Sequence, residues 1–125
     1  MYLVDTCGWI EWLTDSPLAK SYSRYLTSTD TLLVPTLVQH ELYKWLYREI
    51  DQVTALSAIA ATKTATIIPF DTSLALLAAE VAREFKLATA DAIIYATARQ
   101  YDATLITSDA HFANLPQVKY FQKGI

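Results

Sequence analysis

Residues 89–109 read TADAIIYATARQYDATLITSD, and this stretch decides the fold. Thr89 is a suitable helix N-cap. The small or apolar residues that follow recur on one helical face: Ala90, Ile93, Ile94, Thr97 and Tyr101. Residues 103–107 then have the pattern of a short buried strand. The stretch is therefore a helix leading into a strand, with Asp91 in the first helical turn and Asp109 two residues past the strand.

The same alternation of strands and helices runs through the rest of the chain. Further strands are predicted over 2–4, 31–34, 65–70 and 118–121, and further helices over 7–14, 15–26, 36–50, 51–64 and 72–85. Thr36 with Gln39 three residues later has the spacing of a capping box, and Asp71 or Thr72 caps the helix over 72–85. Strands separated by helices imply βαβ units with right-handed crossovers. The expected fold is α/β, a single three-layer α/β/α domain over 1–125 with a central, mainly parallel sheet of four to five strands.

The composition fits a globular protein without a membrane span. Hydrophobic residues make up 53% of the 125 residues, with only two Gly and four Pro, which argues against disorder. Cys7 is the single cysteine, so neither an internal disulfide nor a cysteine zinc site can form. No apolar stretch reaches the roughly 20 residues of a transmembrane helix, and the first residues do not resemble a signal peptide. We expect a cytoplasmic protein.

Four acidic residues fall where the predicted topology can bring them together. Asp5 ends the first strand, Asp109 follows the fourth, Glu41 lies early in the helix after the second strand, and Asp91 lies in the first turn of the helix before the fourth. Ligands of such sheets bind beyond the carboxyl ends of the strands. All four carboxylates can therefore face this one edge.

Clustered carboxylates repel one another unless a cation neutralises them. Oxygen ligands favour a hard ion, Mg²⁺ or Mn²⁺, and the matching chemistry is phosphoryl transfer by a metal-activated water. The formal net charge of −3 argues against a nucleic-acid-binding protein, but a bound divalent ion inverts the local field.

Each acid also has an ordinary interpretation when taken alone. Asp5 could cap a helix, Asp91 could complement a helix dipole, Glu41 could pair with Lys44, and Asp109 could be a turn residue. The functional interpretation rests on the four together.

Four stretches of the chain resemble the motifs of the PIN-domain nucleases, and most closely those of the VapC toxins of bacterial and archaeal toxin–antitoxin pairs. They are 2–6 (YLVDT), 34–42 (VPTLVQHEL), 87–98 (LATADAIIYATA) and 105–112 (LITSDAHF). Residues 115–120 fit the usual final strand, so the resemblance spans essentially the whole chain.

The resemblance implies Mg²⁺- or Mn²⁺-dependent cleavage of RNA. It also implies a homodimer and a cognate antitoxin protein whose C-terminal segment blocks the site. The residues that it assigns to the metal and the attacking water are Asp5, Glu41, Asp91 and Asp109.

Other residues have weaker assignments. Thr6 and Ser108 are expected to support the acids by hydrogen bonds, and Lys86 stands in a turn where many members carry Gly. Lys44 and Arg48 share the helical face of Glu41, where they either line a path for the RNA backbone or form a solvated stripe. For His40 and His111 we favour an ordinary polar role over general-base catalysis, with a phosphate contact by His111 as a testable alternative.

Rival functions fit the sequence less well. A phosphatase of the haloacid-dehalogenase type needs a second Asp where Cys7 stands, and a response-regulator receiver needs a Lys at the end of a core strand. A catalytically silent binding module would be favoured by loss of one acid, but all four are present.

Overall fold

The structure, a computed structural model, describes residues 1–123. Its strands are β1 (Tyr2–Val4), β2 (Leu32–Pro35), β3 (Thr66–Ile68), β4 (Thr104–Thr107) and β5 (Val118–Tyr120). Its α-helices are α1 (Thr6–Leu13), α2 (Ala19–Leu26), α3 (Thr36–Glu49), α4 (Gln52–Thr62), α5 (Thr72–Phe85) and α6 (Thr89–Gln100). Two 3₁₀ helices, η1 (Thr29–Thr31) and η2 (Ala110–Phe112), complete the described elements.

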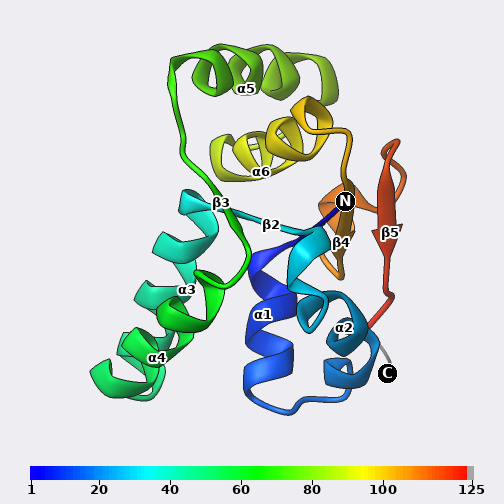
Figure 1. The fold of residues 1–125 in the computed structure, drawn as a ribbon. Coiled ribbons are helices and arrows are strands. Elements are labelled where there is room, and N and C mark those ends of the chain that lie inside the picture. Colours follow the sequence, from blue (N-terminus) through cyan, green and yellow to red (C-terminus); the bar gives the residue numbers. More distant parts are fainter. Residues whose placement is uncertain (124–125) are drawn as a thin grey trace.

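The strands form one five-stranded sheet in the order β3-β2-β1-β4-β5, and every adjacent pair is parallel. Figure 1 shows α5 and α6 together on one side of the sheet and α1 to α4 on the other. The chain runs outward from β1 to β3 and then returns to β4 on the other side of β1. The strand order thus reverses between β1 and β4, which is where α/β proteins bind ligands. The predicted three-layer α/β/α architecture is confirmed.

The three inner strands β1, β2 and β4 are largely buried, and they are accordingly apolar almost throughout. All four residues of β2 are buried, as are Leu3, Val4, Leu105 and Ile106 of the two central strands. No helix of the described residues has the length and apolar character that a membrane crossing requires.

Gly8 of α1 allows unusually close packing at the centre of the fold. A Cβ atom there would lie 2.5 Å from a ring carbon of Tyr22 and 2.5 Å from Cγ1 of Val4. A glycine therefore lets α1 lie directly against α2 and β1, beside the position where β1 ends.

More of helix α6 is buried than the single apolar face that the sequence predicted. Ile94 and Thr97 are buried as expected, but Tyr101 is exposed, and four residues outside the predicted face are also buried: Ala92, Tyr95, Ala96 and Ala98. The reason is that α6 packs against α5, α3 and β4 at once.

The predicted capping box of α3 is wrong. Pro35 is the N-cap of α3 and makes no side-chain capping bond. The Thr36 hydroxyl instead accepts a hydrogen bond from the Phe70 amide (3.3 Å), and the Gln39 amide donates to Thr62 Oγ1 (3.0 Å). Both side chains tie α3 to neighbouring segments.

Two other helix starts also differ from the expectation, whereas one cap is confirmed. Ala88, not Thr89, is the N-cap of α6, and α2 begins only at Ala19. The N-cap of α5 is Asp71, one of the two residues predicted for it, and its carboxylate accepts from the Leu74 amide (2.9 Å).

Candidate metal centre

Asp5 lies where β1 passes into α1, next to β4. Its amide donates to the Ile106 carbonyl (3.0 Å), which fastens it to β4. Its Oδ1 accepts from the Thr6 amide (2.8 Å), and its Oδ2 accepts from the Thr107 hydroxyl (2.9 Å). The residue is only 6% exposed. Asp5 is thus the N-cap of α1 and a nearly buried carboxylate held at both oxygens.

This environment raises the pKa of Asp5 to about 6 from the ordinary 3.8. Burial is the main cause, because it removes water from the anion. The hydrogen bonds from Thr107 and Thr6 oppose the shift, whereas the negative charges of Asp109 and Glu41 add to it. Asp5 therefore lies within electrostatic reach of two other predicted site residues, in a place where a cation would be stabilised.

Glu41 is held beside Asp5 by Thr6. The Thr6 hydroxyl donates to Glu41 Oε1 (2.6 Å), while the Thr6 amide donates to Asp5. One residue at the start of α1 thus orients both Glu41 of α3 and Asp5, which directly follows β1. The two acids are 36 positions apart in the sequence, and the topology together with Thr6 brings them together.

Asp91 and Asp109 form the second part of the cluster, together with His111. Nδ1 of His111 lies 3.1 Å from Asp91 Oδ2 and 3.4 Å from Asp109 Oδ1. One ligand atom from each of the three residues lies within 4.8 Å of the others. Burial and the charge of Asp109 raise the pKa of Asp91, and His111 partly opposes this shift. The histidine was not predicted as a site residue, and the structure places it in η2 rather than in a loop.

Thr107 links the two parts and was also missed from the sequence. Its hydroxyl donates to Asp5 Oδ2 and accepts from the Asp109 amide, both at 2.9 Å. The β1–β4 register pairs Val4 with Ile106, so the next residues along, Asp5 and Thr107, face each other. A hydroxyl residue at the end of β4 was the available signal.

Ser108 is placed differently from the prediction. Its hydroxyl donates to Cys7 Sγ (3.5 Å), and that thiol in turn lies 3.7 Å from Asp5 Oδ2. In the described residues, the hydroxyls bonded to site carboxylates are those of Thr6 and Thr107.

The two predicted RNA contacts, Lys44 and Arg48, are exposed on α3. They lie one and two turns beyond Glu41. Within residues 1–123 neither pairs with an acid of the cluster, and Arg48 Nε lies 3.9 Å from Glu49. The structure therefore places both cations on the surface near the site without fixing them to it.

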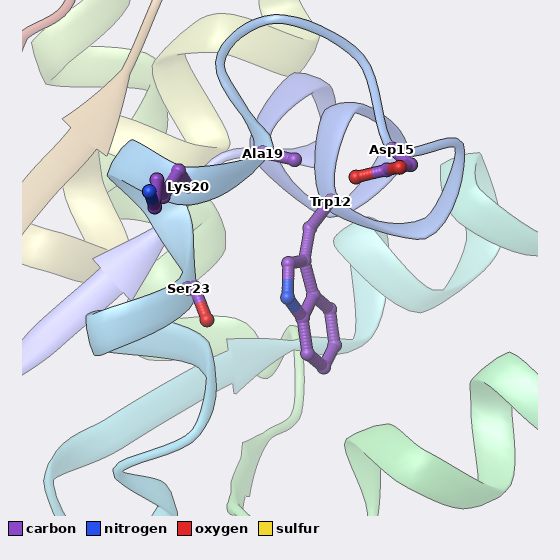
Figure 2. Close-up of a pocket in the computed structure, with 5 residues that line it drawn as sticks. All are labelled: Trp12, Asp15, Ala19, Lys20 and Ser23. Atoms are coloured by element: carbon purple, nitrogen blue, oxygen red, sulfur yellow. The ribbon is translucent and has the colours of Figure 1, made fainter.

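A hollow of about 300 Å³ opens beside Asp91 of α6 and His111 of η2. It is lined by Phe85, Lys86, Leu87, Ala88, Asp91 and His111. A second hollow, also of about 300 Å³, lies at the far end of α1, with Trp12 on one side and Lys20 and Ser23 of α2 on the other (Figure 2). No residue of the acidic cluster lines the second hollow, so only the first adjoins the candidate centre.

The sequence model of the PIN domain matches residues 2–118. The chain belongs to the PIN domain family. No curated protein sequence matches it significantly.

Solved structures share this PIN fold over nearly their whole length. One is a toxin–antitoxin complex from Klebsiella pneumoniae, with a TM-score of 0.81 and 24% identity over 95% of this chain and 96% of that one. Another is VapBC2 from Rickettsia felis bound to a promoter DNA fragment, with a TM-score of 0.77 and 19% identity over 97% and 98%. A third is VapC20 from Mycobacterium tuberculosis, described as a toxin that cleaves the sarcin-ricin loop, with a TM-score of 0.71 and 16% identity over 98% and 90%.

Proposed function

We propose that this PIN domain is a metal-dependent endoribonuclease and the toxin of a VapBC-type toxin–antitoxin pair. The observation that carries the proposal is the gathering of Asp5, Glu41, Asp91 and Asp109, from four separate segments, at the sheet edge where the strand order reverses. The fold neighbours, which include a toxin described as cleaving the sarcin-ricin loop, support RNA as the substrate class.

The donor set fits a hard divalent cation. Carboxylate oxygens suit Mg²⁺ and Mn²⁺, and burial together with neighbouring carboxylates raises the pKa of both Asp5 and Asp91, an effect that a bound cation would oppose. We assign the binding of the ion to Asp5, Glu41, Asp91 and Asp109. Once bound, such an ion supplies an activated water and stabilises charge on the phosphate.

The chain's own contribution is to hold these acids in place before the substrate binds. Thr107 and Thr6 fix both oxygens of Asp5, Thr6 also fixes Glu41, and the His111 amide donates to Asp109 Oδ1 (2.9 Å). Partners of this kind orient ligands and limit rearrangement during reaction.

RNA needs positive charge that the acidic chain does not offer overall. We propose that Lys86, in the hollow beside Asp91, and the exposed Lys44 and Arg48 on α3 contact the phosphate backbone. The negative charge of the cluster itself is neutralised locally by the bound cation.

The proposed partners are a cognate antitoxin and a second copy of the chain. Several fold neighbours are toxin–antitoxin complexes. The hairpin of α3 and α4 also carries large apolar side chains that are about half exposed or more: Tyr47, Ile50, Val53 and Leu56. An apolar surface of this kind is typical of a protein interface.

The test is cleavage of a labelled RNA pool with Mg²⁺, with Mn²⁺ and with EDTA. We expect cleavage with either ion, none with EDTA, and none from Asp5→Asn or Asp91→Asn. Asp30→Asn, which neutralises an exposed acid of η1 outside the cluster, is the matched control and should cleave normally. Cleavage that survives chelation would exclude the metal mechanism, and an inert protein that binds no cation would point to a binding module.

A further inference from the structure

His111 is an exposed residue with an unexpected set of neighbours. Its side chain is 72% exposed, yet Nδ1 lies within 3.4 Å of both Asp91 and Asp109. The backbone holds His111 close to Asp109, because the Asp109 side chain caps η2 by accepting a hydrogen bond from the His111 amide. The 3₁₀ turn thus directs an imidazole nitrogen toward two carboxylates.

The spacing of these atoms matches one coordination sphere. Adjacent ligands of an octahedral ion with bonds of 2.0–2.2 Å are about 3 Å apart. Nδ1 lies 3.1 Å from Asp91 Oδ2 and 3.4 Å from Asp109 Oδ1, and one ligand atom from each of the three residues lies within 4.8 Å of the others. Nδ1 is therefore spaced from each carboxylate as a neighbouring ligand of one ion would be.

We propose that Nδ1 of His111 is a direct ligand of the cation bound by Asp91 and Asp109, and that this nitrogen makes the centre prefer Mn²⁺ over Mg²⁺. The inference rests on the proposed function, to which it adds a ligand and an ion preference. Mg²⁺ demands a near-ideal octahedron and keeps several of its waters. Mn²⁺ also suits carboxylates, but as a first-row transition ion it accepts an imidazole nitrogen more readily than Mg²⁺ does.

Two other roles would give His111 the same position in the structure. It could hold the two acids by hydrogen bonds and leave when the ion binds, or it could contact an RNA phosphate. Neither role puts nitrogen in the coordination sphere, so spectroscopy of the bound ion separates them from ligation.

The experiment is pulsed electron paramagnetic resonance of Mn²⁺ bound to the full chain without RNA. The wild type should show ¹⁴N coupling typical of a bound imidazole, and protein made with ¹⁵N-histidine should show ¹⁵N coupling instead. His111→Ala should lose the coupling and bind Mn²⁺ on the order of tenfold more weakly, while its Mg²⁺ affinity changes by less than about threefold. His40→Ala, at an exposed position on α3, is the control and should match the wild type.

Three results would overturn the inference. Bound Mn²⁺ without nitrogen coupling would remove His111 from the coordination sphere and leave the proposed nuclease intact. Loss of RNA binding in His111→Ala with unchanged nitrogen coupling would assign the residue to phosphate. Failure of the wild type to bind Mn²⁺ at all would overturn both this inference and the proposed function.

Discussion

Asp5→Asn removes the most perturbed carboxylate of the cluster, and its effect on stability can be worked out from the structure. The pKa of Asp5 is about 6 in the folded chain, against an ordinary value of 3.8. That difference corresponds to about 3 kcal/mol. Asp5 is 6% exposed, so solvent screening reduces this figure little.

The sign follows from proton binding. Between pH 3.8 and about 6 the folded chain retains a proton on Asp5 that the unfolded chain has lost, so stability falls as the pH rises through this window. Below this pH window Asp5 is protonated in both states and does not destabilise the folded chain. Above the window the folded chain bears the full cost of a buried, ionised carboxylate. Asparagine stays neutral and can accept from the Thr6 amide and donate to the Thr107 hydroxyl. We expect Asp5→Asn to be more stable than the wild type by about 2–3 kcal/mol at pH 8 without metal, with no difference below pH 4.

The assay is urea denaturation in EDTA from pH 3.5 to 8, followed by the fluorescence of the three tryptophans. Asp30→Asn is the control and should show no such pH-dependent gain. Adding Mg²⁺ should stabilise the wild type and not Asp5→Asn, because ligand binding to the folded state adds to its stability. A variant less stable than the wild type at pH 8 would refute the reasoning, since Asp5 would then serve mainly as an anionic helix cap.

The remaining predictions concern residues that support the site and the fold. Thr107→Val removes the hydroxyl partner of the buried Asp5 carboxylate and of the part-buried Asp109 amide. We therefore expect a loss of about 1–3 kcal/mol in urea denaturation and a further rise in the pKa of Asp5, measured by NMR titration. Lys86 has a left-handed backbone with φ of 56°, so Lys86→Gly should raise the midpoint of thermal unfolding through a gain of about 1 kcal/mol; a loss would show that the lysine side chain stabilises the turn. Gly8→Ala should lower the same midpoint by a cost of about 1–3 kcal/mol, despite the better helix propensity of alanine, because the new Cβ would lie 2.5 Å from Tyr22.

The sequence was sufficient where local patterns decide the structure. The apolar runs predicted the strands because a parallel sheet covered on both faces requires them. The cap of α5 could be narrowed to Asp71 or Thr72 because a capping side chain bonds within its own helix turn, as Asp71 does. The acids could be placed because the carboxyl ends of parallel strands meet at one edge, which is a rule of topology.

The sequence was insufficient where the role of a side chain depends on a partner far away in the chain. Thr36 has the spacing of a cap, but its hydroxyl is bonded to Phe70, 34 positions away. Thr107 acts on Asp5 across the β1–β4 register, 102 positions away, and its role depends on strand pairing that no local pattern reveals. His111 joins the cluster only because η2 turns it back toward Asp91.

The central claim is that carboxylates from four segments bind one divalent-cation centre. Calorimetric titration of Mn²⁺ into the wild type and into variants that neutralise one acid each tests it most directly: Asp5→Asn, Glu41→Gln, Asp91→Asn and Asp109→Asn. We predict binding to the wild type and a loss of about tenfold or more in affinity for every variant, with the fold retained by circular dichroism. Unchanged affinity in any of these variants would remove that acid from the centre, and a wild type that binds no Mn²⁺ would contradict the account.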